Sequence, residues 1–241
     1  MSLAITIDVD GEAGLPGGGR GYEQRLSSRS EREYGLRRGL DRLLALLADA
    51  PATFYVPGVT AQAHPGAVRE LVAAGHEVGH HGHTHRRPDL LAAAEQRAEL
   101  ARGLATLAEL GVVPRGYRAP GWELTPATLA ALGELGFAYD SSLMADDRPY
   151  RLAGGLVELP VHWTLDDAPH FAAGGDVDGL WRVWARELEL AAAESRPLTL
   201  TLHPEITGRP HRAELLRRVL ELAGELALTP VTHAALATRC R

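Results

Sequence analysis

Near its start the chain reads Ala4-Ile5-Thr6-Ile7-Asp8-Val9-Asp10-Gly11-Glu12, an apolar run that ends in acidic residues. The apolar and β-branched residues at its beginning are typical of a buried strand. Because side chains alternate along a strand, Asp8 and Asp10 are expected to point the same way. One of two such carboxylates can bind a metal ion while the other stays free as a base. A solvated acidic turn is the alternative, and this segment alone does not decide between them.

Strand-like segments alternate with helical ones along the rest of the chain. Strands are predicted near residues 3–8, 52–57, 76–80, 113–118, 137–140, 156–161, 198–203 and 229–232. Segments rich in Ala, Leu, Glu and Arg, with helical spacing, are predicted at 36–48, 64–74, 90–110, 126–135, 180–193 and 212–226. The alternation predicts an α/β fold with a parallel sheet, and a length of 241 residues favours a barrel over an open sheet. We expect a single catalytic domain over residues 1–241.

A dense group of histidines follows one of the predicted strands. Gly75-His76-Glu77-Val78-Gly79-His80-His81-Gly82-His83-Thr84-His85 holds five of the eleven histidines in the chain. Neutral imidazole is the commonest side-chain metal ligand near neutral pH. His81 and His85 are four residues apart, which would place both rings on one face of a helical turn and close to one ion. A loop of solvated histidines is the alternative, but the density of histidines favours a metal site.

Three more polar clusters come at the ends of strand-like segments. Arg118-Ala119-Pro120-Gly121-Trp122 offers a guanidinium, a rigid turn and an indole, Asp140-Ser141-Ser142 ends another strand, and His203 ends a strand that Pro204 stops. Each cluster alone has a structural explanation, such as a surface ion pair or a capping carboxylate. In α/β barrels, however, catalytic groups collect at the C-terminal ends of the strands. Together the clusters therefore predict one active site at that end of the barrel.

The motifs, taken in order, resemble those of the NodB-type polysaccharide deacetylases, carbohydrate esterase family four. The resemblance runs from residue 4 to about 235 and rests on Asp8-Val9-Asp10, His81-Gly82-His83-Thr84-His85, Arg118-Ala119-Pro120 and His203. It implies the distorted parallel (β/α) barrel of that family, with about seven strands. It also implies a hydrolase that acts on a carbon–nitrogen bond other than a peptide bond.

The resemblance assigns a role to each motif residue. Asp10, His81 and His85 are implied as ligands of one divalent metal ion, with zinc the first expectation for two histidines and a carboxylate. Asp8 is implied as the general base, with Arg118 orienting it. The implied general acid is His203.

Further residues are expected around this centre. We expect Trp122, His83 and Asp140 to contact the substrate. His76 and His80 are expected to be structural or to support the ligands. The glycine-rich segment 14–21 is expected to be either a lid over the site or a connector.

Some motifs depart from those of most family members. Val9 separates the two aspartates, Gly82 follows the first ligand histidine, and no Asp-Trp pair is present in the fourth motif. These features are more similar to the branch that holds intracellular peptidoglycan-deacetylase-like proteins, cyclic imide hydrolases and allantoinase-like ureide hydrolases. The substrate is therefore expected to be either an N-acetylated glycan or a small imide or ureide. The sequence does not show which aspartate orients His203.

Composition limits the partners and the location. The formal net charge of −6 gives no electrostatic footprint for nucleic acid or for an anionic membrane. Cys240 is the only cysteine, so no intrachain disulfide is expected. No apolar run approaches the ~18 residues of a membrane span. A strand that starts at Leu3 leaves no room for a signal peptide, which favours a cytoplasmic location. A homo-oligomer remains open.

Two other classes of protein fit part of the pattern. A non-haem iron oxygenase also uses two histidines and a carboxylate, but it has no need of Asp8, Arg118 and His203. A metal-less carbohydrate-binding protein would need only a groove and an aromatic platform such as Trp122. The retention of Asp8 and His203 argues against such a binding protein.

Overall fold

The fold is seen in a computed structural model that describes residues 1–15 and 20–240. The glycine-rich segment 14–21, expected to be a lid or a connector, therefore lies partly outside the described residues. The strands are β1 (Ser2–Asp8), β2 (Thr53–Val56), β3 (Glu77–His80), β4 (Gly116–Tyr117), β5 (Tyr139–Asp140), β6 (Tyr150–Arg151), β7 (Val157–Glu158), β8 (Leu198–Leu202) and β9 (Thr229–Val231).

The strands form one curled sheet in the order β6-β7-β5-β4-β3-β2-β1-β8, and β9 pairs with the start of β1. Every pairing is parallel apart from that between β6 and β7. Beyond β7, Asp166 forms an isolated parallel bridge with Thr201 of β8, which brings the two ends of the sheet together. The prediction of a distorted parallel (β/α) barrel is confirmed, but the sheet of the described residues has nine strands rather than about seven.

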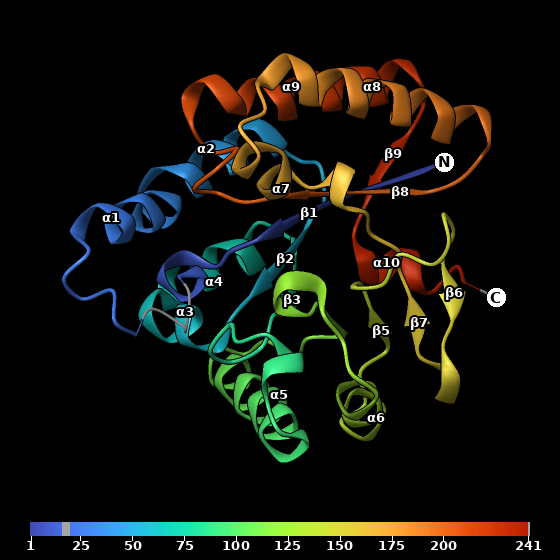
Figure 1. Cartoon of the computed structure of the whole chain (residues 1–241). Coiled ribbons are helices and arrows are strands. Elements are labelled where there is room, and N and C mark those ends of the chain that lie inside the picture. Colours follow the sequence, from blue (N-terminus) through green and yellow to red (C-terminus); the bar gives the residue numbers. More distant parts are fainter. Residues whose placement is uncertain (16–19, 241) are drawn as a thin grey trace.

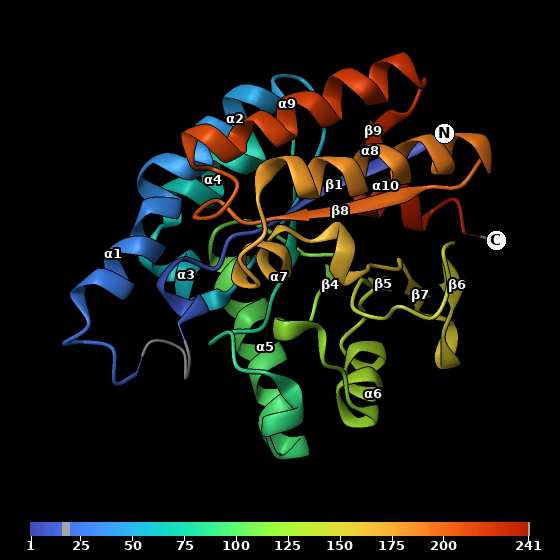
Figure 2. The ribbon, with the colours of Figure 1, turned by 45° about the horizontal axis from the view of Figure 1, so that its top comes forward.

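Helices cover the outside of the curled sheet (Figures 1 and 2). They are α1 (Leu26–Tyr34), α2 (Leu40–Leu47), α3 (Gly58–Ala63), α4 (Pro65–Ala73), α5 (Ala93–Glu109), α6 (Pro126–Glu134), α7 (Asp167–Ala172), α8 (Val177–Ala193), α9 (Pro210–Glu225) and α10 (His233–Ala237). A π-helical turn, Gly35–Gly39, joins α1 to α2. Of the helices in the described residues, none combines the length and the apolar character needed to cross a bilayer.

The position of β1 in the core explains its nearly continuous apolar sequence. All residues of β1 are buried, because β1 lies in the middle of the sheet and pairs with β2, β8 and β9. Ile5 and Ile7 pack with the apolar faces of α2, α8 and α9 in the largest hydrophobic cluster. Strands buried on both faces carry nearly continuous apolar sequence.

The sequence misses β6, a two-residue edge strand that pairs antiparallel with β7. Such a short strand has no hydrophobic run or alternation from which it could be recognised.

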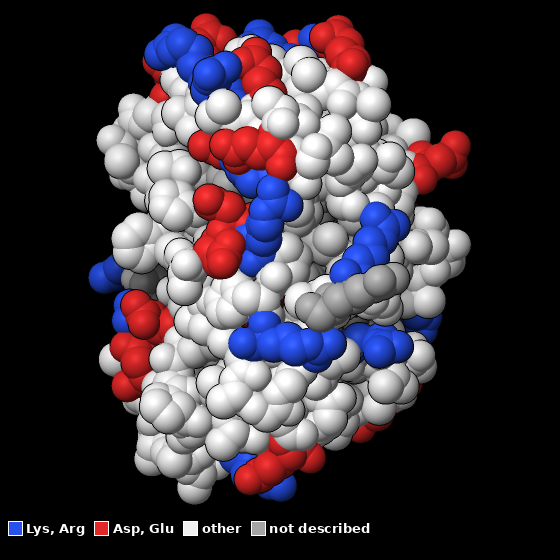
Figure 3. Space-filling model, turned by 90° about the vertical axis from the view of Figure 1, so that its right-hand side faces the viewer, with Lys and Arg blue, Asp and Glu red and all other residues white. Residues whose placement is uncertain are grey.

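The side of the molecule that carries β6 has acidic and basic side chains interspersed among uncharged ones (Figure 3).

Candidate active site

The loop that follows β3 brings the two predicted ligand histidines together. The rings of His81 and His85 lie with their centroids 4.9 Å apart. The prediction that a helical turn pairs them is wrong, because residues 81–85 form an irregular loop. Gly82 and His85 have left-handed backbones, with φ of 73° and 57°. The left-handed conformations of these two residues, rather than helical periodicity, bring the two imidazoles together. A left-handed backbone is uncommon for a residue other than glycine, which fits a functional constraint at His85.

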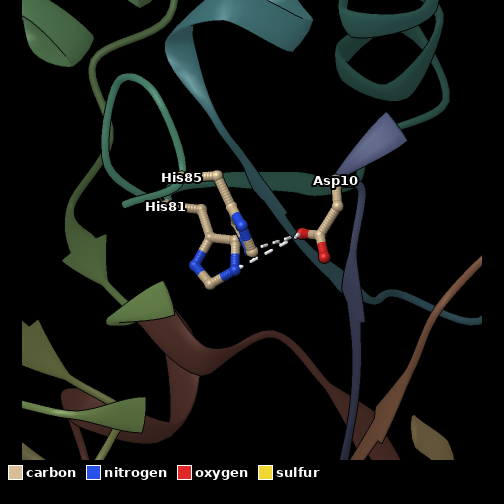
Figure 4. Close-up of side chains that lie close together, drawn as sticks. All are labelled: Asp10, His81 and His85. Atoms are coloured by element: carbon tan, nitrogen blue, oxygen red, sulfur yellow. Dashed lines mark ion pairs between the residues drawn. The ribbon is translucent and has the colours of Figure 1, made fainter. Parts of the chain in front are cut away.

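Asp10 completes the group from the end of the first strand. The Nε2 atoms of His81 and His85 lie 3.5 and 3.3 Å from Asp10 Oδ1, and both rings point toward that carboxylate (Figure 4). Asp10 itself has a helical backbone just beyond β1, so strand alternation does not orient it as predicted. Asp8 and Asp10 nevertheless line the same cavity.

The donor set fits a divalent metal ion. Asp10, His81 and His85 each place a ligand atom within 4.8 Å of the others. Asp10 Oδ1 is buried and has no hydrogen-bond partner. Burial opposes ionisation of Asp10, yet the adjacent His85 and His81 lower its pKa well below the usual range. His81 Nδ1 donates to the carbonyl oxygen of Arg118 at 2.7 Å, which leaves Nε2 free to face the carboxylate.

Asp8 and Arg118 form a buried ion pair beside this group. Arg118 has no exposed surface, and its Nη1 donates to Asp8 Oδ1 and to Thr6 Oγ1, both at 2.8 Å. Its Nε and Nη2 donate to the carbonyl and hydroxyl oxygens of Ser141, each at 3.1 Å. The other carboxylate oxygen of Asp8, Oδ2, lies 3.7 Å from His81 Nε2. Arg118 therefore holds one oxygen of Asp8. The other oxygen faces Asp10, His81 and His85, which we call the metal-binding group.

His203 lies on the same cavity, at the end of β8, and the structure supplies the partner that the sequence did not assign. His203 Nδ1 lies 2.7 Å from Asp167 Oδ1, and the His203 backbone N–H donates to Asp167 Oδ2 at 3.0 Å. Thr207 donates to the same Asp167 oxygen. Burial disfavours the charged imidazole, but Asp167 raises the pKa of His203 well above its usual range. The signal for Asp167 in the sequence is weak, since an Asp-Asp pair that begins a helix is usually a cap.

Asp166, Asp167 and His203 also lie close enough to hold a metal ion. This second group is already satisfied internally, because both oxygens of Asp167 accept hydrogen bonds. Asp166 caps α7 by accepting from Ala168 N–H at 2.8 Å, and burial raises its pKa to about 7. The unpartnered oxygen of Asp10 makes the first group the better metal site.

The cavity that these residues share has a volume of about 350 Å³. Trp122, which is predicted to contact the substrate, lines it and is nearly buried. Trp163 also lines the cavity and is 58% exposed. The sequence did not single out Trp163, because an isolated tryptophan in a loop is more often part of the core.

Two predicted substrate contacts are not found in this cavity. The described residues that line it include neither His83 nor Asp140. His83 is buried against Gly58, where an added Cβ would lie 2.2 Å from its Nδ1, so the ring has a packing role. Asp140 is fully buried and accepts from Ser142 Oγ at 3.0 Å. Both side chains are thus directed into the protein rather than toward a substrate.

Arg32 is a wall residue that the sequence did not reveal, and Glu205 is its buried partner. Arg32, on α1, lines the cavity, pairs with Glu205 Oε1 and lies 3.9 Å from Asp10 Oδ2. Gly14 leaves room for this approach, because a Cβ there would lie 2.8 Å from Arg32 Nη1. Burial raises the pKa of Glu205 to about 6. The residues come from distant parts of the chain, so no local motif marks them.

Comparisons with known proteins show the family of the chain. A sequence model described as polysaccharide deacetylase matches residues 34–139. The whole chain superposes on a candidate polysaccharide deacetylase from Mycobacterium smegmatis, with a TM-score of 0.92, 38% identity and coverage of 90% of that chain. The chain belongs to the polysaccharide deacetylase family. The resemblance drawn from the sequence motifs is confirmed.

Two further proteins that the chain resembles differ in the substrate that their names state. The peptidoglycan deacetylase of Helicobacter pylori is 29% identical over 91% of this chain and 88% of its own length. PuuE allantoinase is 25% identical, with a TM-score of 0.88 over 98% of this chain and 89% of that one. As a member of the polysaccharide deacetylase family, the chain is a deacetylase-type hydrolase that acts on carbon–nitrogen bonds other than peptide bonds.

Proposed function

We propose that this protein is a metal-dependent hydrolase that removes N-acetyl groups from a glycan. The observation that carries the proposal is the content of one cavity, where a three-residue metal-binding group adjoins a free carboxylate oxygen and a histidine. An oxygenase has no use for the last two groups. A metal-less binding protein would not need the buried Asp8–Arg118 and Asp167–His203 pairs, which are costly to desolvate.

Asp10, His81 and His85 would hold one divalent ion, most suitably zinc for this ligand set. Such an ion, when bound, polarises a carbonyl and lowers the pKa of bound water from ~15.7 towards ~7. Asp8 would remove the proton from the attacking water through Oδ2, the oxygen that Arg118 does not occupy. Arg118 would hold this carboxylate in the correct orientation through its hydrogen bond to Oδ1.

His203 would act as the general acid. An amide nitrogen leaves poorly as an anion, so a hydrolase of C–N bonds must protonate it. Asp167 binds His203 Nδ1, which leaves Nε2 to carry the transferable proton toward the cavity. The charge of Asp167 favours the protonated imidazole, which is the form that an acid requires.

A small cyclic imide or ureide is the second candidate substrate. It is favoured by the likeness to PuuE allantoinase and by a cavity of about 350 Å³, large enough for a single small ring. Exposed Trp163 at the same cavity favours the glycan, because an indole offers a stacking face to a sugar ring.

A substrate panel distinguishes the two candidates. N-acetylglucosamine oligomers would be compared with hydantoin, succinimide and allantoin, after chelation and reloading with zinc, cobalt, nickel, manganese or iron(II). We expect release of acetate from the oligomers with at least one metal. Turnover of only the cyclic compounds would show that the substrate is an imide or ureide and not a glycan. Absence of turnover on every member, with metal bound, would contradict both candidate substrates. The Asp8→Asn protein, purified in the same way, controls for contaminating enzymes.

The metal-binding group gives a prediction that does not depend on the substrate. We expect His81→Ala and His85→Ala to lose the divalent ion that the wild-type protein binds, because each removes one of three ligands. Elemental analysis after dialysis against a defined metal buffer measures this loss. His64→Ala is the matched control, since His64 lies 3.5 Å from Glu12 and is not in the group. Full metal occupancy in both ligand variants would show that the ligand assignment is wrong.

A further inference from the structure

Two buried carboxylates lie next to each other at the ends of neighbouring strands. Asp140 ends β5 and Glu158 ends β7, and the two residues are partners in the parallel register. Neither side chain is exposed. Asp140 Oδ2 and Glu158 Oε2 are buried oxygens without a hydrogen-bond partner. Burying two adjacent negative charges is costly, so the pair needs a neutralising partner.

A proton meets this need better than a cation does. Among the described residues, neither Asp140 nor Glu158 forms an ion pair, and no third metal-binding side chain completes a group with them. A single shared proton would give each unpartnered oxygen a hydrogen bond. Burial, and then the charge of Asp140, raises the pKa of Glu158 to about 10, whereas burial raises that of Asp140 to about 6. Tyr117 and Tyr150 face the pair, since burial and then the charges of Asp140 and Glu158 raise the pKa values of these phenols.

The outer oxygens of the pair hold the turn that follows β5. Glu158 Oε1 accepts from the backbone N–H groups of Ser142 and Leu143, both at 3.0 Å. Asp140 Oδ1 accepts from Ser142 Oγ at 3.0 Å. The two carboxyl groups therefore bind three donors of one short turn, and they fix its position relative to the sheet.

The same turn supports the catalytic groups. Ser142 Oγ accepts from the N–H of Ala119 at 2.9 Å, and Ser141 accepts two hydrogen bonds from the Arg118 guanidinium. The peptide group between Arg118 and Ala119 also accepts from His81 Nδ1 through its carbonyl oxygen. The turn thus lies one hydrogen bond from Arg118, and Arg118 contacts both Asp8 and His81.

We propose that Asp140 and Glu158 share one proton and act as positioning residues that hold Arg118, and through it Asp8 and His81. Loss of the shared proton would place two like charges side by side and displace the turn. The kinetic test below rests on the proposed function, whereas the spectroscopic test does not.

The shared proton is tested directly by infrared spectroscopy near pH 8, between the two pKa values. Wild-type protein is expected to show the carbonyl stretch of a buried protonated carboxyl group. Glu158→Gln should lack it, because Asp140 is then left to ionise alone. Absence of the band from the wild-type protein, or its persistence in Glu158→Gln, would overturn the shared proton.

Stability against pH gives a second measure of the same proton. A carboxyl group whose pKa is raised in the folded state binds its proton more tightly there than in the unfolded chain. Its contribution is fully present below the unfolded value of 4.5 for Glu158 and is lost as pH rises toward about 10. In urea titrations, Glu158→Gln is expected to decline less than the wild type over this range. Parallel pH profiles for the two proteins would contradict the assignment.

The positioning role is tested with two variants at Glu158 on a substrate that the panel identifies. Glu158→Gln keeps an acceptor for the turn and a donor for Asp140, so we expect kcat within about 3-fold of wild type. Glu158→Ala removes the acceptor and the donor. It should lower kcat on the order of 10²-fold with KM nearly unchanged, because a catalytic group is then misplaced.

Glu77→Ala is the matched control. Glu77 on β3 also accepts a backbone N–H, that of Ala234, together with the hydroxyls of Thr53 and Tyr139. We expect it to lower Tm and leave kcat of the folded protein unchanged. Equal kcat losses in Glu77→Ala and Glu158→Ala, or in both Glu158 variants, would overturn the positioning role. A wild-type protein that hydrolyses nothing would contradict the proposed function, and the infrared band would still decide the state of the pair.

Discussion

Asp8→Asn is expected to lower kcat by roughly 10²–10⁴-fold without loss of the bound metal, because it removes a general base and no ligand. Only Oδ2 of Asp8 faces the metal-binding group, and Oδ1 is held by Arg118 at 2.8 Å. An asparagine can still accept from Arg118, but it cannot take a proton from water. Steady-state kinetics and elemental analysis on the same preparation measure the two effects.

The same substitution should also lower stability. Arg118 is fully buried and Asp8 is its only ion-pair partner among the described residues. Leaving a buried charge without its partner costs about 3–5 kcal/mol in other proteins, and the retained hydrogen bond places the expected loss near the lower end. Urea unfolding of the metal-loaded protein measures this cost.

Asp10→Asn is the matched variant for Asp8→Asn. It should weaken metal binding itself, since Asp10 Oδ1 is the buried oxygen that faces both histidines. If the two variants lose metal equally, both carboxylates act on the ion and the assignment of Asp8 as base is wrong.

His203→Ala should have the second large effect, and one that depends on the leaving group. Against an amide or imide we expect a loss of ~10²-fold or more, because the departing nitrogen must be protonated. Against a nitrophenyl ester the loss should be markedly smaller, because a stable phenolate leaves unaided. Metal content should stay unchanged in both assays.

Two variants make the His203 result specific. His203→Gln keeps a donor for buried Asp167 and guards against misfolding as the cause. His170→Ala, on the neighbouring helix α7, alters a histidine that contacts the backbone oxygen of Asp176 and does not line the cavity, so full activity is expected. An equal loss on ester and amide would instead mean that His203 acts on binding or on the oxyanion.

Much of the architecture follows from local pattern. The predicted strands at 3–8 and 198–203 correspond to β1 and β8, whose hydrophobic patterns are long enough to be recognised, and the one at 229–232 corresponds to the shorter β9. The predicted helix at 90–110 is found as Ala93–Glu109. The short α3 and α7, of six residues each, were missed, because a helix of that length shows less than two turns of periodicity.

The residues of the candidate site were also predicted in part from the sequence. The sequence predicted that Asp8, Asp10, His81, His85, Arg118 and His203 would come together, and the structure places them around one shared centre. Their roles in binding metal and in catalysis stay predictions. The reasoning that joined His81 to His85 was wrong in its geometry, since a loop with two left-handed residues and not a helix brings the rings together.

By itself, the sequence determined the parallel barrel, the family, and the strand ends at which polar side chains collect. Apolar runs and residue order carry that information, because every strand of such a barrel ends at the same rim. Only the tertiary structure decided that Asp167 holds His203, that Glu205 holds Arg32, and that Asp140 and Glu158 lie buried together rather than facing a substrate. These partners are set by strand register and by helix packing across the barrel. A contact between residues far apart in the chain leaves no periodic mark at either residue, so it becomes visible only when the chain has closed on itself.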